Sequence, residues 1–210
     1  MPVLLCQCFY ASPFISEPHV TSAVAKPVET HVLYVIMPAN TEADPDDFMI
    51  TANDLETPYT QYSTTVKPEW IDYNGHMNVG YYHIAFDTAV EPFFHWLGLT
   101  PEYRSSNQCS TFAHEAHLNF LREVNEGDKI RFESRLLDFD RKRIHFYQEM
   151  FHEEEGFLAA SHESISSYMD MQTRKTAPLP EDITTRLQRV KEAHKTLETP
   201  WQVGNVISTR

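Results

Sequence analysis

One segment near the middle of the chain constrains the fold most, because it is a helix pattern that is apolar on most of its faces. Eight residues recur there at helical spacing, and they are Tyr82, Ala85, Phe86, Ala89, Val90, Phe93, Phe94 and Leu97. So much aromatic bulk does not suit a surface helix, so we expect burial on most sides. Gly98 is suited to end this helix, and Pro92 predicts a kink or a split in two.

The residues after this helix alternate with a period of two, which predicts strands. Polar turns follow one another closely, and this spacing favours antiparallel meanders over parallel crossovers. A sheet wrapped around the helix is the economical way to bury it, so we expect an α+β fold with five antiparallel strands. The expected strands cover residues 61–66, 112–121, 129–139, 143–152 and 157–171.

The two ends of the chain differ in composition from this central part. Residues 1–55 hold six of the 13 prolines, none of the six glycines and a formal charge of -6, which predicts a poorly ordered extension. Residues 56–180 form the expected domain. Residues 181–210 form a C-terminal amphipathic helix and tail, in which Glu181 and Asp182 suit a helix start. Its apolar stripe is Ile183, Leu187, Val190 and Leu197.

Charge and cysteine content argue against several classes of protein. The formal net charge of -13 is unfavourable for nucleic-acid binding. The three cysteines give no disulfide framework and suit a reducing compartment. No apolar run approaches the ~20 residues that span a bilayer, so we expect a cytoplasmic protein without a membrane partner. The group His114-Glu115-x-His117 lacks a third ligand, so no metal is expected.

The main candidate for a catalytic site is a strand-to-helix turn that contains a carboxylate. Its sequence is Asp72-Tyr73-Asn74-Gly75-His76-Met77-Asn78. A carboxylate activates water or attacks a carbonyl, and N–H groups at a helix start stabilise an oxyanion. We expect unpaired N–H groups around Met77 and Asn78. Spacing alone favours Asp72 as a simple helix cap, and it leaves His76 and Asn78 open between function and structure.

The segment Trp70-Ile71-Asp72-Tyr73-Asn74-Gly75-His76-Met77-Asn78, followed by Tyr81-Tyr82, resembles hotdog-fold thioesterases of the 4-hydroxybenzoyl-CoA thioesterase type. The similarity continues over roughly residues 58–180. The residues of the segment itself are most similar to the betainyl-CoA thioesterase module associated with carnitine dehydrogenase. The downstream matches are Phe120-Leu121-Arg122-Glu123-Val124 with Gly127-Asp128, Arg143-Ile144-His145, Ala159-Ala160 and Pro178-Leu179-Pro180.

This resemblance implies a hotdog fold and an acyl-CoA thioesterase, acting on betainyl-CoA or another short acyl-CoA. It gives Asp72 the role of general base or nucleophile, with His76 and Asn78 as catalytic neighbours. The family often has a second acidic residue where this chain has Trp70. A different hotdog lineage uses a carboxylate on the central helix, for which Asp87 and Glu91 are the alternates.

The resemblance also implies a homodimer or dimer of dimers with the active site at the subunit interface, and a role in carnitine metabolism. Coenzyme A is part of the substrate, so no cofactor is expected. The expected substrate-binding residues are Tyr73, Gly75, Met77, Glu115 and His117, and the basic residues expected to hold the coenzyme A phosphates are Arg141, Lys142 and Arg143.

The two residues on the strand, Glu115 and His117, should share one face while His114 points away. A quaternary ammonium group would call for cation–π contacts. The aromatic candidates for such contacts are Tyr62, Trp70, Tyr73, Phe93, Trp96 and Tyr103.

Two other functions fit the same fold. A hotdog hydratase or dehydratase is one, because Asp72, Asn74 and His76 resemble an Asp-x-Asn…His motif with the histidine one residue early. A non-catalytic acyl-CoA-binding domain is the other.

Overall fold

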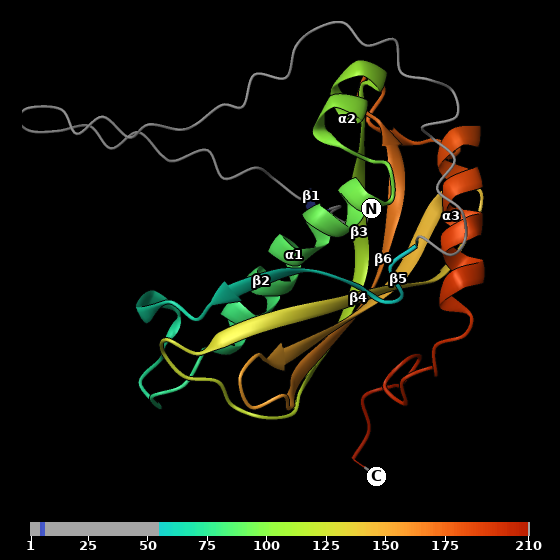
Figure 1. The fold of residues 1–210 in the computed structure, drawn as a ribbon. Coiled ribbons are helices and arrows are strands. Elements are labelled where there is room, and N and C mark those ends of the chain that lie inside the picture. The colour runs from blue at the N-terminus through green and yellow to red at the C-terminus, as the bar shows by residue number, and fades with distance from the viewer. Residues whose placement is uncertain (1–4, 7–54, 210) are drawn as a thin grey trace, which may run out of the picture. The chain divides into compact units, whose positions relative to one another are not determined.

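The computed structural model describes residues 5–6 and 55–209, and everything below refers to them. Figure 1 shows the helix α1 lying across a curved sheet, with α3 beside the strands β4 and β5. The elements in chain order are β1 (Leu5–Cys6), β2 (Tyr59–Thr65), the 3-10 helix η3 (Pro68–Trp70), α1 (Val79–Trp96), α2 (Pro101–Asn107), β3 (Cys109–Phe120), β4 (Lys129–Phe139), β5 (Arg143–His152), β6 (Leu158–Asp170), β7 (Lys175–Thr176) and α3 (Glu181–His194).

The sheet is antiparallel throughout, as the strand spacing predicts. Its order is β1-β3-β6-β5-β4-β2, and β7 pairs with β6. The five expected strands are all present. The two-residue strands β1 and β7 were not expected, because so short a segment carries no period. The predicted extension over residues 1–55 lies outside the described residues except for β1 and Leu55.

The helix α1 is buried against one face of the sheet, which we call the inner face. Phe86 lies between Phe132 of β4 and His162 of β6, with ring centroids 5.5 and 5.2 Å away. The sheet side of this core includes Ile130, Met150 and Ala160, all fully buried. Burying each large apolar side chain contributes roughly 1.5–3 kcal/mol, so this contact is the main stabilising term of the domain.

Of the two effects expected at Pro92, the split is wrong, because the helix runs unbroken from Val79 to Trp96, and the kink stays a prediction. Proline costs a helix interior about 3 kcal/mol. The next turn carries Phe93 and Phe94, which are fully buried, and their packing offsets that cost. The predicted stop is confirmed. Gly98 has a φ of 97° and donates its N–H to the His95 carbonyl, while Leu99 donates to Phe94, which is a Schellman ending.

The helix α2 was not predicted, although the sequence contains residues that are typical of a helix start. Thr100 caps it by accepting the Tyr103 N–H at 3.1 Å, and Pro101 occupies the first helical position. The helix α3 begins as expected at Glu181, and it buries Ile183, Leu187 and Val190. The predicted stripe extends too far, because α3 ends at His194, before Leu197. No described helix combines the length and the apolar character that crossing a membrane requires.

A row of polar side chains crosses the inner face beneath α1. Gln148 donates to Ser134 Oγ at 3.0 Å, and its carbonyl oxygen lies 3.1 Å from His162 Nδ1. All three residues are buried. Burial first, and His83 second, lowers the pKa of His162 to about 3. The imidazole is therefore neutral in the folded protein at ordinary pH.

This neutral histidine predicts a loss of stability in acid. Above pH 6.5 His162 is unprotonated in both states, and below it only the unfolded chain gains the proton until the folded pKa is reached. Between pH 7 and pH 5, the free energy of unfolding should fall by about 2 kcal/mol more in the wild type than in His162→Asn. Urea denaturation at the two pH values measures this difference. Equal falls in both proteins would contradict the assignment.

Candidate active site

The loop between η3 and α1 is held at its far end by hydrogen bonds to the β3–β4 connection and to η3. Met77 donates its N–H to Val124 at 2.9 Å, and Asn78 donates to Trp70 at 2.8 Å. Ile71 and Met77 form an isolated bridge. Gly75 sits at the tip with a φ of 87°, a conformation that favours glycine. These bonds hold the loop in one position at the start of α1.

Asp72 lies half-buried in this loop and does not cap the helix. Its Oδ1 accepts the Asn74 N–H at 2.8 Å. The cap is Asn78, whose Oδ1 accepts from Gly80 at 2.9 Å. The Asn78 amide nitrogen also lies 3.4 Å from Asp72 Oδ2. The cap explanation therefore applies to Asn78, and Asp72 is a carboxylate held next to a helix start without capping it.

The expectation of free N–H groups at Met77 and Asn78 is wrong, because both donate to backbone carbonyls. Gly80 donates to the cap, and Tyr81 donates to the Asn78 carbonyl. Val79 is the first residue of α1, and within the described chain its N–H makes no hydrogen bond. An oxyanion donor at the helix start is therefore best assigned to Val79, where the helix dipole adds to its effect.

The other expected loop residues are placed in different surroundings. The His76 carbonyl accepts the Asp72 N–H at 3.0 Å, but the His76 side chain faces elsewhere: its Nδ1 lies 3.2 Å from the Met77 carbonyl, and its Nε2 lies 3.7 Å from Glu123. Tyr73 is 97% exposed beside Asp72, whereas Met77 is only 1% exposed and packs in the core. The Met77 side chain therefore has no access to a substrate, because the core needs an apolar residue there.

Trp70 stands where the resemblance implies a second acidic residue, and here it is part of the core. It is buried, and its ring stacks on Tyr81 at 5.9 Å. Of the two alternates on α1, Glu91 pairs with Arg104 at 2.8 Å and with His95 at 3.0 Å. Asp87 is exposed one turn earlier on α1.

The strand residues lie away from the Asp72 loop within one chain. Leu118 packs in the core, so alternation turns Glu115 and His117 to the outer face of the sheet. The expectation for His114 is wrong, because a β-bulge between Ala113 and Glu115 breaks the alternation. His114 lies 2.6 Å from Ser167 Oγ and lines the same cavity as Glu115.

That cavity, of about 630 Å³, also brings in the expected basic cluster of Arg141, Lys142 and Arg143. Asp140 binds Arg143 through two hydrogen bonds. The Arg143 guanidinium, aided by backbone N–H groups, lowers the pKa of Asp140 to about 2. The side chains of Arg141 and Lys142 make no ion pair within the described residues.

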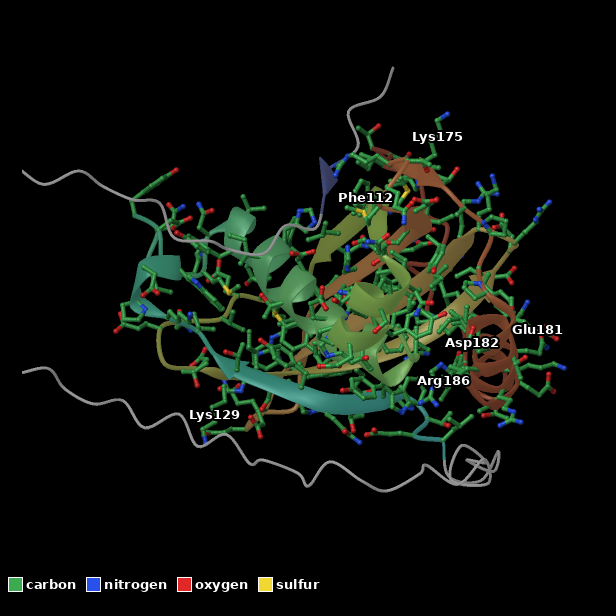
Figure 2. The ribbon with its side chains drawn as sticks, turned by 90° about the horizontal axis from the view of Figure 1, so that it is seen from above. Phe112, Lys129, Lys175, Glu181, Asp182 and Arg186 are labelled. Carbon is green, nitrogen blue, oxygen red and sulfur yellow. The ribbon has the colours of Figure 1, made fainter. Side chains whose placement is uncertain are left out.

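The cavity and the Asp72 loop lie at different ends of the sheet. From His114 to Phe120 the strand runs for ~20 Å. In Figure 2, Lys129, at the loop end of β4, lies well apart from Phe112 of β3 and Lys175 of β7. The basic cluster and Asp72 are therefore not adjacent in one chain.

The aromatic candidates do not gather into a cage. Phe93 is a core residue, Trp96 stacks on His194 at 5.8 Å, and Tyr103 contacts Asp182. Among the six, Tyr73 alone is an exposed ring on the loop.

Two features escaped the sequence argument, namely the Val79 N–H and the pair His83–His162. The pair joins α1 to β6, with ring centroids 5.8 Å apart. Helical spacing does place Val79, His83 and Asp87 on one stripe of α1, and all three are exposed. This stripe is the sequence pattern from which Val79 and His83 could have been found.

Comparison with known proteins points to one family. The model of the thioesterase-like superfamily matches residues 66–187. The betainyl-CoA thioesterase of Pseudomonas aeruginosa is 35% identical over 148 residues, which are 70% of this chain and 93% of that protein. The L-carnitine dehydrogenase/betainyl-CoA thioesterase of Ruegeria pomeroyi is 34% identical over 73% of this chain, but over only 31% of its own length.

A solved structure supports the same conclusion. A hypothetical protein from Staphylococcus aureus in complex with CoA superposes with a TM-score of 0.68 and is 27% identical, covering 74% of this chain and 99% of that one. The fold, the loop and the match over residues 66–187 together show that this chain belongs to the thioesterase-like superfamily of hotdog-fold acyl-CoA thioesterases.

Proposed function

We propose that this enzyme hydrolyses a short acyl-CoA thioester, with betainyl-CoA as the leading substrate, and that Asp72 is its catalytic carboxylate. One observation carries the proposal: the Asp72 carboxylate lies 3.4 Å from the side-chain nitrogen of Asn78, which caps α1, and the next residue, Val79, has an N–H without a partner among the described residues. The betainyl substrate is supported by the relative from Pseudomonas aeruginosa. The family favours hydrolysis over the hydratase and non-catalytic alternatives.

The chemistry follows from these two groups. The thioester carbonyl oxygen would accept a hydrogen bond from Val79, where the helix dipole stabilises the negative charge that develops. Asp72 would either remove a proton from an attacking water or attack the carbonyl carbon itself. In the second case water then hydrolyses the resulting anhydride. Both routes consume one water and release a free acid and the thiol of coenzyme A.

Asn78 connects the two parts of this arrangement. Its side-chain oxygen caps α1, while its amide nitrogen faces Asp72 Oδ2. It therefore fixes the position of the carboxylate relative to the helix start, as a positioning residue. His76 faces Glu123, so its catalytic role stays a prediction.

Arg141 and Lys142 are the proposed contacts for the coenzyme A phosphates. They line the cavity of about 630 Å³ and are not neutralised by a described carboxylate, in contrast to Arg143. Coenzyme A is elongated, with its nucleotide far from its thioester, so this site need not adjoin Asp72. Arginine and lysine are suited to bind phosphate oxygens.

A dimer would complete the site. Among the described residues, β3 pairs with β1 only at Phe112 and Ala113, so we propose that its edge from His114 to Phe120 receives a second copy. Exposed apolar side chains surround this edge and the start of α1, and they are Val79, Ile84, Phe120 and Leu121. We propose that two chains pair along β3 and that a dimer of dimers builds on this unit. Glu115 and His117 would then lie close to the subunit contact.

Replacing Asp72 by asparagine should lower kcat by about 100-fold or more, with a much smaller change in KM. Asparagine keeps an oxygen to accept the Asn74 N–H, so the loop should hold its shape. Hydrolysis is followed with a thiol reagent across acyl-CoA substrates that include betainyl-CoA. The matched control is Asp138→Asn. It removes a carboxylate of β4 that pairs with Lys191 of α3 and is not part of the Asp72 loop. A variant at full rate would rule out the assigned carboxylate.

The double variant Arg141→Ala/Lys142→Ala should raise KM for acyl-CoA by about tenfold. Its KM for the matching acyl-N-acetylcysteamine thioester should not change, because that substrate lacks the nucleotide. Lys195→Ala, an exposed lysine on the C-terminal side of α3, serves as the control. An equal change for both substrates would show that the basic residues do not contact the nucleotide.

Ala116→Arg should break the proposed dimer, because it puts a bulky charge on the exposed β3 edge of both chains. Light scattering coupled to gel filtration should then report a monomer, and activity should fall with it. Arg in place of Ala at an exposed position should leave the circular dichroism spectrum intact. An active dimer after the substitution would exclude this edge as the interface.

A further inference from the structure

The polar row under α1 ends in an atom that has no partner. His162 is 3% exposed, and its Nε2 makes no hydrogen bond in the described structure. A buried polar atom left unpaired destabilises the folded state, so an apolar residue at this position would be more stable. The inner face keeps a histidine here, although the residues around it are mostly apolar. Such an exception in a core is a candidate binding group.

The direction of this atom follows from the hydrogen bonds of the row. The Gln148 amide nitrogen donates to Ser134, so its oxygen is the acceptor for His162 Nδ1. The proton therefore lies on Nδ1, and Nε2 carries a lone pair. The two nitrogens lie on different sides of the ring. Because Gln148 belongs to β5, Nε2 is directed away from β5, toward β3 and α1.

His83 lies on that side of His162, with its ring centroid 5.8 Å away. Its side chain is exposed, one helical turn after Val79 on the same stripe of α1. One turn advances ~6 Å along the helix axis. The acyl group of a thioester whose carbonyl oxygen meets the Val79 N–H would therefore extend toward His83, whose ring is in turn in contact with His162.

The charge of this end of the site suits a cation. Burial and His83 keep the pKa of His162 low, so its ring stays neutral and offers a lone pair with partial negative charge. Asp87 adds a carboxylate one turn beyond His83. In a betainyl group the quaternary nitrogen is two bonds from the carbonyl carbon, which is less than a helical turn, but the His83 side chain leans back toward the start of α1 and so toward the ammonium group. An anionic acyl group would face repulsion from the same atoms.

We propose that His83 and His162 form the acyl-recognition end of the site and select a short acyl group that ends in a quaternary ammonium. This inference rests on the proposed function, because it takes Val79 as the anchor of the thioester. Recognition by two imidazoles takes the place of cation–π contacts with the aromatic candidates that the sequence offers. The faces and lone pairs of the rings supply the negative potential that trimethylammonium requires.

The test compares two substrates of the same shape, betainyl-CoA and 3,3-dimethylbutyryl-CoA, in which carbon replaces the charged nitrogen. Two variants probe the pair. His162→Asn keeps a donor toward Gln148 and removes the Nε2 lone pair. His83→Leu removes the ring from an exposed position, so it retains the fold even where a core substitution would not. Glu192→Gln on α3 is the control for a distant change of charge.

The wild type should prefer betainyl-CoA, and each variant should lower the ratio of the two kcat/KM values by about tenfold. Glu192→Gln should keep the wild-type ratio. An unchanged ratio in both histidine variants overturns this inference and leaves the proposed function standing. A wild-type enzyme that favours the neutral substrate also overturns it. If the wild type hydrolyses neither of these nor any other acyl-CoA, the proposed function fails as well.

Discussion

The burial of α1 against the inner face of the sheet is the contact on which the rest of the structure depends. It fixes the position of the helix start, and the bonds from Met77 to Val124 and from Asn78 to Trp70 then fix the loop that carries Asp72. A carboxylate on a loop of this kind would otherwise sample many positions. Here the hydrophobic effect supplies the energy, and a few directional hydrogen bonds supply the accuracy that catalysis needs.

Long periodic segments were predictable because their pattern reflects which side is buried. The aromatic spacing of α1 and the alternation of β4 and β5 led directly to a helix inside an antiparallel sheet, and the structure agrees. Local exceptions were not predictable in this way. Pro92 is held in a continuous helix by the packing of its neighbours, and the bulge at His114 depends on pairing with β6.

The site was predictable in part. Motif resemblance singled out Asp72, whereas helix-start reasoning chose the wrong N–H groups, because the partners of Met77 and Asn78 are distant in sequence. Arg141 and Lys142 were named from composition, but only the fold shows that Asp140 neutralises Arg143 and leaves the other two unpaired within the described residues. The pair His83–His162 joins elements nearly 80 residues apart, and no local pattern records such a contact.

The C-terminal helix α3 is built into the same arrangement. A Cβ at Gly98 would come within 3.2 Å of Ile183 and 3.3 Å of Arg186, and Arg186 Nε donates to the Trp96 carbonyl at the end of α1 at 2.7 Å. The residue that ends α1 therefore also sets how closely α3 can approach. The last part of the chain acts as a buttress for the far end of α1, so a chain shortened before Glu181 would lose support for the active site as well as a surface helix.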